Sequence, residues 1–330
     1  MAKPKSGPPS AGRKLALKAG QRLETTRHWL IGQAARAALV TLRQLPADKA
    51  LAFADRTARR IGPMTGRHRI AVENLRLAYP GKAKAEIEEI AHGMWGHMAR
   101  LAAEYIFLDE LFDFDPNHPD RPGRIEVDGA ETFLRIAAEK RPHIIFTAHL
   151  GNFEMLPVAA ASLGLDVTAL FRAPNNPFIA DYVFSTRRVT MGDLLASRAG
   201  ASFALSRILD EGGNIGVLVD QRFRGGEETT FFDRRCQTNP LLAKLARYHE
   251  CDVYPARCVR LPNNRYRLQI EDRLELPRTE GGTVDVNATC QLLNDVVERW
   301  VREQPEQWMW FHKRWAISKR SRRRPQAQRG

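Results

Sequence analysis

A histidine and a glutamate lie five positions apart in the segment TAHLGNFE, and this spacing suits acid–base chemistry. His149 ends an apolar run, and Glu154 opens a stretch of helical character after a turn at Gly151 and Asn152. A histidine at a strand end can meet a carboxylate one turn later, and the carboxylate then holds the imidazole in one tautomer. Such a pair predicts a general base for a hydroxyl nucleophile. A hydrogen-bonded turn histidine and a glutamate at a helix N-terminus would give the same spacing.

Polar residues also follow two other predicted strands, in the segments LFRAPNN and VDQRFRGG. Ligands of open α/β sheets bind where strands end, so these segments are candidate binding loops. Arg172 has the charge to stabilise an oxyanion or bind a phosphate, with a solvated surface arginine as the alternative. The predicted substrate-binding residues are the polar ones at the three strand ends: Asn152, Asn175, Asp220, Gln221 and Arg222. The last three also fit a simple turn into a solvated, glycine-containing loop.

The sequence lacks the other common catalytic motifs. It contains no G-x-S-x-G elbow, no Walker A loop and no G-x-G-x-x-G motif. Its four cysteines form neither a C-x-x-C pair nor a zinc spacing with histidines: Cys236, Cys251, Cys258 and Cys290. We therefore predict no metal, no cofactor and reduced, buried thiols in a cytoplasmic setting. Direct attack by a substrate hydroxyl is then favoured over a covalent acyl-enzyme.

Strands and helices alternate from residue 124 onward, which predicts an α/β fold with a mixed, mostly parallel sheet flanked by helices. The expected strands are 125–129, 143–149, 166–171, 214–221, 251–259 and 265–270. The expected helices of this body are 129–140, 153–164, 178–191, 201–211, 238–249 and 286–303. Helices at 28–45, 47–61 and 84–107 precede it, and the Pro- and Asp-rich loop 113–123 marks the boundary.

The formal charge of +13 is concentrated at the two ends of the chain. Residues 1–30 hold seven Lys or Arg and one acid, and residues 313–330 hold eight and no acid, so the remainder is close to neutral. We predict four segments: a basic disordered tail (1–27), a helical region (28–123), an α/β body (124–317) and a basic tail (318–330). Basic tails on a neutral body fit an anionic membrane surface, a nucleic-acid backbone or simply solvated ends.

No run of about 20 uncharged apolar residues exists, so the sequence predicts no clear membrane-spanning helix. The segment 28–45 is amphipathic, with Trp29 near its start and Arg36 and Arg43 within it, which predicts a helix lying in the lipid interface. Packing against the body is the alternative. The closing segment PEQWMWFHKRW mixes aromatic and cationic residues and suits a membrane interface and packing against the body equally.

The chain resembles the late acyltransferases of lipid A biosynthesis, the lauroyl/myristoyl transferase family of Gram-negative bacteria in the lysophospholipid acyltransferase-like group. The resemblance extends from about residue 28 to 317. It is carried, in this order, by the blocks HRIAVENLRLAYP, TAHLGNFEM, FRAPNNP, GVLVDQ, TTFFDR and PEQWMWFHKRW. The order and spacing of these blocks are far more specific than any single one.

The resemblance implies a glycerolipid acyltransferase-like α/β enzyme at the cytoplasmic face of the inner membrane. It would carry an acyl group from acyl carrier protein or coenzyme A to a hydroxyacyl chain of a phosphorylated glucosamine disaccharide, the lipid A precursor. His149 would be the base, Glu154 its partner, and Arg172 the residue that stabilises the tetrahedral intermediate. Asp220 and Gln221 match a D-Q block for which a structural or substrate-positioning role is expected.

Two features depart from the family pattern. Asp233 stands where glycine is usual, in a region that could shape the acyl groove, which leaves the acyl-chain length open. Arg36 and Arg43 lie where many relatives have a more apolar anchor, which argues against a spanning helix.

Two other functions fit parts of the sequence. The same fold could acylate a glycerophospholipid, an ornithine lipid or another glycolipid. A pI near 10.0, a lone RGG at 224–226 and the SKRSRRR tail would suit a non-enzymatic nucleic-acid-binding protein. The near-neutral body and the absence of RGG repeats argue against that second function, so no nucleic-acid partner is expected.

Overall fold

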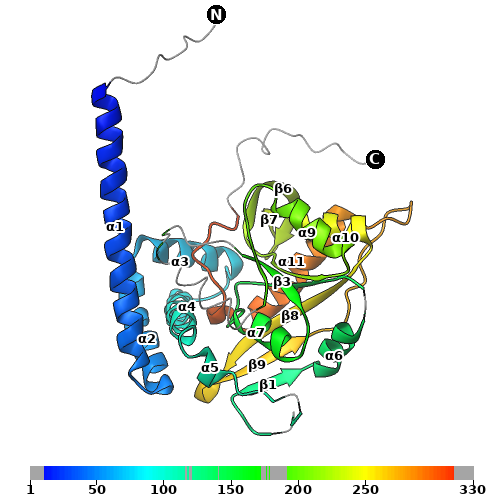
Figure 1. Cartoon of the computed structure of the whole chain (residues 1–330), viewed down its shortest axis with the longest axis horizontal. Helices are drawn as coiled ribbons and strands as arrows, with labels where there is room; N and C mark the ends of the chain where they lie inside the picture. Colours follow the sequence, from blue (N-terminus) through cyan, green and yellow to red (C-terminus); the bar gives the residue numbers. More distant parts are fainter. Residues whose placement is uncertain are drawn as a thin grey trace, which may run out of the picture.

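A seven-stranded sheet forms the centre of the protein in a computed structural model (Figure 1). The structure describes residues 11–115, 117–118, 121–139, 141–171, 176, 178 and 192–315. Three sequence-based predictions therefore fall outside the described residues, wholly or nearly so: the helix at 178–191, the roles of Arg172 and Asn175, and the tail at 318–330.

The central sheet is mixed and mostly parallel, as predicted. Its strands are β1 (Ile125–Asp128), β2 (His143–Thr147), β3 (Val167–Phe171), β4 (Leu194–Ala196), β5 (Asn214–Leu218), β8 (Asp252–Leu261) and β9 (Arg265–Ile270). They are ordered β1-β9-β8-β2-β5-β3-β4. Only β8 and β9 pair antiparallel, and the other neighbours pair parallel. The carboxyl ends of β2, β3 and β5 therefore meet at one edge of the sheet.

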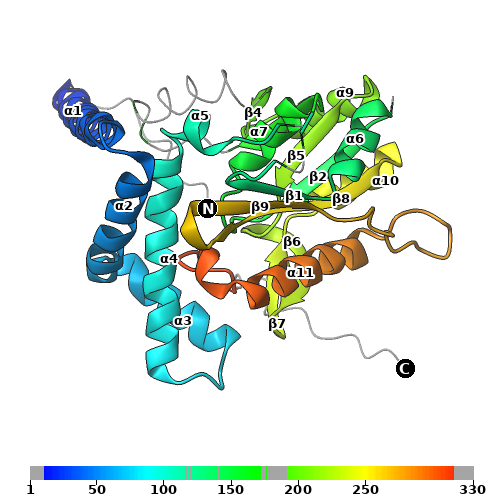
Figure 2. The same cartoon turned by 90° about the horizontal axis from the view of Figure 1, so that it is seen from below.

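Helices cover both faces of this sheet. The helices of the body are α6 (Ala130–Ala138), α7 (Met155–Ser162), α9 (Ala201–Asp210), α10 (Leu241–His249) and α11 (Val286–Glu303). Figure 2 shows α7 and α11 on opposite sides of the sheet. Side chains alternate between the faces of a strand, so on β2 Phe146 stacks on Trp300 of α11, whereas Ile145 belongs to the core cluster that contains Leu156 of α7.

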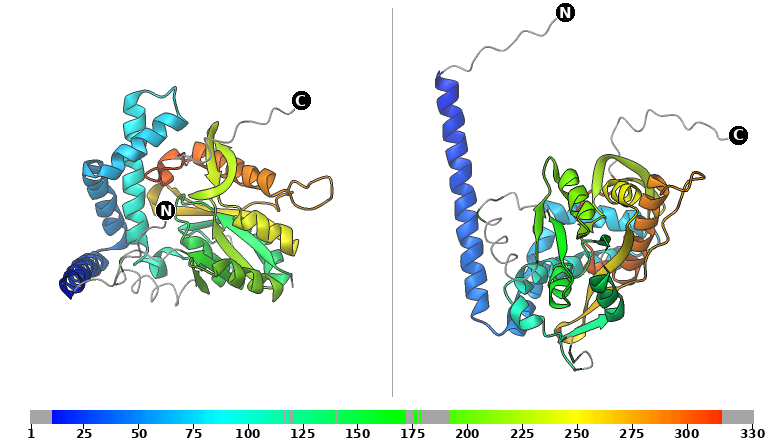
Figure 3. Two further views of the ribbon diagram at one scale, coloured as in Figure 1. Left: turned by 90° about the horizontal axis from the view of Figure 1, so that it is seen from above. Right: turned by 45° about the vertical axis from the view of Figure 1, so that its right-hand side comes forward.

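A helical region precedes the sheet, as predicted, and forms one side of the molecule (Figure 3). It comprises α1 (Ala11–Arg43), α2 (Ala47–Ile61), η1 (Gly62–Met64), α3 (Gly66–Ala78), α4 (Lys84–Glu104) and α5 (Leu108–Leu111). Helix α1 begins at Ala11, inside the segment predicted to be a disordered tail. The C-terminal end of α4 packs against the sheet, where Ala103 belongs to the same core cluster as Ile145.

A hairpin not anticipated from the sequence follows β5. Strands β6 (Arg222–Phe231) and β7 (Arg234–Thr238) pair antiparallel across a turn at Phe232 and Asp233, which have φ values of 50° and 57°. Glycine adopts the left-handed backbone of Asp233 most easily, and aspartate is among the few other residues that tolerate it.

The closing aromatic segment packs against the body. Past α11 and η3 (Pro305–Gln307), the side chains of Trp308 and Trp310 are buried in the core that also contains Trp300. Of the two alternatives for this segment, packing against the body is therefore the correct one for both tryptophans.

Candidate active site

His149 and Asp220 follow neighbouring parallel strands in matching register. Thr147 at the end of β2 pairs with Leu218 at the end of β5. The amide of Val219 continues this ladder by donating to the carbonyl of Thr147 at 3.1 Å. Because both strands run in the same direction, the residues two positions beyond their ends lie side by side at the carboxyl edge of the sheet. This register places His149 beside Asp220.

Asp220 holds His149 through both carboxylate oxygens. Its Oδ1 lies 2.8 Å from Nδ1 of His149, and its Oδ2 accepts the backbone N–H of the same residue at 3.0 Å. The indole N–H of Trp308 also donates to Oδ2, at 2.8 Å. Burial alone would raise the pKa of Asp220, but the charge and hydrogen bonds of His149 and the indole of Trp308 lower it to about 2. The carboxylate is therefore ionised at neutral pH and favours the Nδ1–H tautomer of the ring.

The other ring nitrogen of His149 meets an amide. Nε2 of Gln221 lies 3.0 Å from Nε2 of His149. With the proton on Nδ1, Nε2 carries the lone pair and accepts from the amide of Gln221. If a substrate hydroxyl took the place of the Gln221 amide, Nε2 of His149 would be oriented to accept its proton.

A tight turn carries His149 out of the sheet. Gly151 has a φ of +57°, and a Cβ atom there would lie 1.9 Å from the carbonyl oxygen of Cys258 on β8. The backbone amide of Asn152 donates to that same carbonyl at 2.9 Å. Only glycine allows this close approach, which fixes the turn against β8.

An apolar cavity of about 210 Å³ lies beside His149, between the sheet and α7. Its space results from small residues, because Gly216 pairs with Ala169 on the sheet and Ala160 faces them from α7. Larger apolar side chains form most of the remaining wall, among them Phe133, Ile145, Phe146, Phe153, Leu156, Pro157, Val167, Leu170, Phe171, Leu194, Val217 and Leu218. An apolar cavity beside a candidate general base suits a hydrocarbon chain.

Two of the predicted site residues line this cavity. Glu154, the N-cap residue of α7, lines the cavity together with His149. The carboxylate of Asp220 also lies at hydrogen-bond distance from the imidazole, although the family resemblance implied only a structural or substrate-positioning role for this residue.

Asn152 and Arg222 are not among the residues that line this cavity. Asn152 is 1 % exposed, and its side-chain amide donates to Glu104 at 2.9 Å. Arg222 is the first residue of β6, directly after Gln221. Arg172 and Asn175 lie outside the described residues.

A family model for bacterial lipid A biosynthesis acyltransferases matches residues 17–316, a range that includes the cavity and all of the contacts above. The chain belongs to this family. No similarity to a curated protein was found. Family membership makes the protein an acyltransferase of lipid A biosynthesis, as the sequence blocks had indicated.

Two side-chain clusters in the described part of this acyltransferase have the atoms of a metal site, but ordinary contacts explain both. They are His68–Glu88–His92 and Glu139–His143–Asp252. In the first, Trp95 donates to Nδ1 of His68 at 3.2 Å, so the ring proton is on Nε2, 3.0 Å from Glu88. In the second, Arg141 contacts both carboxylates, at 2.8 and 2.5 Å.

The cysteines of the acyltransferase are free and buried, as predicted. Burial raises the pKa of Cys251 and of Cys290 to about 12, and it also raises the pKa of Cys258 beside the active-site turn. These three thiols are therefore protonated at neutral pH and poor nucleophiles.

Sequence reasoning missed two residues of this site. Trp308 was assigned only to an aromatic segment, and Glu104 only to a helix. Both reach the site through contacts between distant parts of the chain, so no local spacing could reveal them. The one available signal was that Glu104 interrupts an apolar helix end, LAAEYIF.

Proposed function

We propose that the protein transfers a fatty acyl group from an acyl carrier protein or coenzyme A thioester to a hydroxyl of a lipid A precursor, with His149 as general base. The observation that carries this proposal is the imidazole held by Asp220 at an apolar cavity. Family membership supplies the reaction class and lipid A biosynthesis.

The reaction can be written with this chain's own residues. Nε2 of His149 takes the proton of the acceptor hydroxyl while its oxygen attacks the thioester carbonyl, which forms the C–O bond. Collapse of the tetrahedral intermediate breaks the C–S bond, and the imidazolium returns the proton to the leaving thiolate. Asp220 keeps the ring oriented and stabilises its charged form.

The remaining predicted residues have defined places in this proposal. Glu154 offers a second carboxylate on the cavity wall and would help to stabilise the imidazolium. Arg172 would stabilise the oxyanion, as the family resemblance implies. Gln221, Arg222 and Asn175 would bind the acceptor or the donor. The acyl chain would occupy the cavity beneath α7, with its thioester at His149.

The site of action is proposed to be the cytoplasmic face of the inner membrane, with α1 in the lipid interface. This helix exposes large apolar side chains: Trp29, Leu30, Ile31 and Val40. Arginines lie among them at positions 27, 36 and 43. An amphipathic helix of this kind binds anionic lipid surfaces through both groups. None of the helices in the described ranges is both long and apolar enough to cross a bilayer.

The proposal is tested with purified protein, an acyl-carrier-protein thioester and a lipid A precursor, with products followed by mass spectrometry. His149→Ala should abolish transfer, whereas replacement of the exposed His118 by alanine should not. Acyl-coenzyme A replaces the first donor in a second arm. A glycerophospholipid and an ornithine lipid serve as rival acceptors, and a clear preference for either would replace the lipid A precursor. Wild-type rates in His149→Ala would refute the mechanism.

A further inference from the structure

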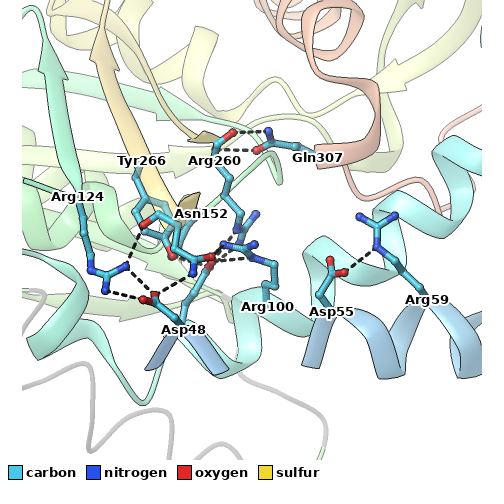
Figure 4. A network of polar contacts seen from close by, with 11 residues as sticks. Asp48, Asp55, Arg59, Arg100, Arg124, Asn152, Arg260, Tyr266 and Gln307 are labelled. Atoms are coloured by element: carbon cyan, nitrogen blue, oxygen red, sulfur yellow. Dashed lines mark hydrogen bonds and ion pairs between the residues drawn. The ribbon is translucent and has the colours of Figure 1, made fainter. Parts of the chain in front are cut away.

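A fully buried carboxylate lies behind the active-site turn. Glu104, the last residue of α4, is 0 % exposed. It accepts hydrogen bonds from Nε and Nη2 of Arg260 at 2.8 and 2.5 Å and from the hydroxyl of Tyr266 at 2.9 Å. Its fourth hydrogen bond, at 2.9 Å, comes from the side-chain amide of Asn152. Figure 4 shows the side chains of Asn152, Arg260 and Tyr266 gathered in this network. The carboxylate therefore joins the helical region to β8, β9 and the turn that carries His149.

This arrangement is demanding for a buried group. Burial alone would raise the pKa of Glu104, but the guanidinium of Arg260 holds it below its usual range, so the carboxylate is charged. Four hydrogen bonds fill the acceptor sites of its two oxygens. Buried ion pairs contribute little stability over well-packed apolar residues, because removing both charges from water costs about as much as their attraction returns. The charged network is therefore better explained by the fixed positions that its hydrogen bonds impose on the connected segments than by a gain in stability.

The hydrogen bonds of this network converge on the turn at Gly151 and Asn152, which follows His149. The backbone amide of Gly151 donates to the carbonyl of Gln307 at 3.0 Å. The side chain of Gln307 in turn bonds both the backbone N–H and the carbonyl of Arg260, at 2.8 and 2.9 Å. Arg260 is thus held through its backbone by the segment that holds Gly151, and through its side chain by the carboxylate that holds Asn152.

We propose that Glu104 is a positioning residue of the acyltransferase, which acts through Asn152 to fix the turn that places His149 against Asp220. Neither Glu104 nor Asn152 touches the substrate in this proposal, since both are buried. The proposal rests on the function proposed above, because it requires His149 to be the base. A shift of the imidazole by about 1 Å can lower a rate about 100-fold, so loss of this hydrogen bond should act on turnover and not on binding.

Two single variants remove one hydrogen bond each from the same carboxylate. Asn152→Ala removes the bond to the turn, and Tyr266→Phe removes a bond from β9 that does not reach the turn. In both, Arg260 still neutralises Glu104, so both variants should fold. Asn152→Ala should lower kcat by roughly 10- to 100-fold with unchanged KM values for donor and acceptor. Tyr266→Phe should keep kcat within about twofold of wild type. Its melting temperature should fall about as much as that of Asn152→Ala, because each variant loses one hydrogen bond to the same carboxylate.

A third variant extends the series of expected kcat values. Asn152→Asp replaces the donor by a carboxylate beside Glu104, so its kcat should fall below that of Asn152→Ala. Glu104→Gln is less informative, because it leaves the buried guanidinium of Arg260 unpaired and endangers folding.

The outcomes separate this inference from its alternatives. Equal kcat losses in Asn152→Ala and Tyr266→Phe, each matched by a loss of melting temperature, would mean that the network only stabilises the fold. A raised KM for the acceptor in Asn152→Ala, with kcat unchanged, would mean that Asn152 binds substrate, and would overturn the positioning role. If His149→Ala is inactive while Asn152→Ala keeps wild-type kcat, only this inference fails. If His149→Ala is fully active, the proposed function itself fails.

Discussion

Asp220 binds His149 twice, at the ring Nδ1 (2.8 Å) and at the backbone amide (3.0 Å), so one carboxylate sets both the orientation and the position of the imidazole. The two residues are far apart in sequence and meet only because β2 and β5 pair in parallel. Asp220 is therefore the first residue to test after His149 itself.

Asp220→Asn should lower kcat on the order of 10²- to 10⁴-fold, because an amide neither enforces the Nδ1–H tautomer nor stabilises the imidazolium. The measurement is steady-state acyl transfer followed by mass spectrometry, beside Glu154→Gln measured in the same way. A larger loss in Glu154→Gln than in Asp220→Asn would make Glu154 the principal partner of His149, as the spacing in the sequence first suggested.

Trp308→Phe should lower kcat about tenfold, because Oδ2 of Asp220 loses the indole N–H while the aromatic packing remains. Trp310→Phe is the matched control, since the indole of Trp310 donates to the carbonyl of Pro305, away from Asp220. Equal rates for the two variants would contradict a role of the Trp308 indole in the site.

Gly216→Val should shorten the acyl chain that the enzyme transfers. A Cβ atom at Gly216 would lie 3.3 Å from Cγ1 of Val167, so a branched side chain there would fill the cavity. Activity with the longest accepted donor should fall at least about tenfold, while a shorter donor keeps most of its rate.

The control for Gly216→Val is a variant with one additional side-chain carbon on the opposite face of the sheet. Val253 on β8 packs in the other core, so Val253→Ile should leave the chain-length profile unchanged. Competition among acyl-carrier-protein thioesters of graded length gives the readout. An unaltered profile in Gly216→Val would mean that the acyl chain lies elsewhere.

His97 should make the fold sensitive to mild acid. Burial and the positive charges of Arg260, Arg100 and Arg59 lower the pKa of His97 from 6.5 to about 2. The folded state keeps the ring neutral, whereas the unfolded chain takes up a proton below about pH 6.5, so stability is lost as pH falls below that value. The loss should be about 1.4 kcal/mol per pH unit.

Urea unfolding between pH 7 and pH 5 tests this. His97→Gln should show a shallower decline than wild type, even if it is less stable at pH 7. His118→Gln is the control, because the His118 side chain is 72 % exposed and its loss should leave the slope unchanged. Identical slopes for His97→Gln and wild type would show that His97 is not the source of the acid sensitivity.

Elements with strong periodic patterns could be predicted from the sequence. The predicted bounds 47–61 and 286–303 agree with α2 and α11, and the predicted strand at 265–270 agrees with β9. Each has a regular apolar repeat or a clear flanking turn, so local chemistry decides its structure. The α/β class followed from the alternation of such elements.

The β6–β7 hairpin could not be predicted in the same way. Its first strand contains the RGG sequence, which is typical of a loop, and its turn is Phe-Asp in place of the usual Asn-Gly. The hairpin forms because tertiary contacts support it, including a hydrogen bond from Trp315 to the carbonyl of Phe231 at 2.8 Å.

The candidate site was found in part. The position of His149 at the carboxyl edge of the sheet followed from the polar residues at the strand ends. The spacing in the sequence favoured Glu154 as the partner, because a carboxylate five residues away is visible in one dimension. The contact with Asp220 depends on strand register, and the contact of Asn152 with Glu104 depends on helix packing. Neither is encoded in a local motif.

The segment from Gln307 to Met309 contacts the site at three places: Gly151 through a carbonyl, Asp220 through an indole, and the carbonyl of His149 through the amide of Met309. During translation these residues leave the ribosome after every strand of the sheet. A nascent chain can therefore form its sheet before His149 and Asp220 have received the contacts of this segment. The complete active site then forms late in synthesis.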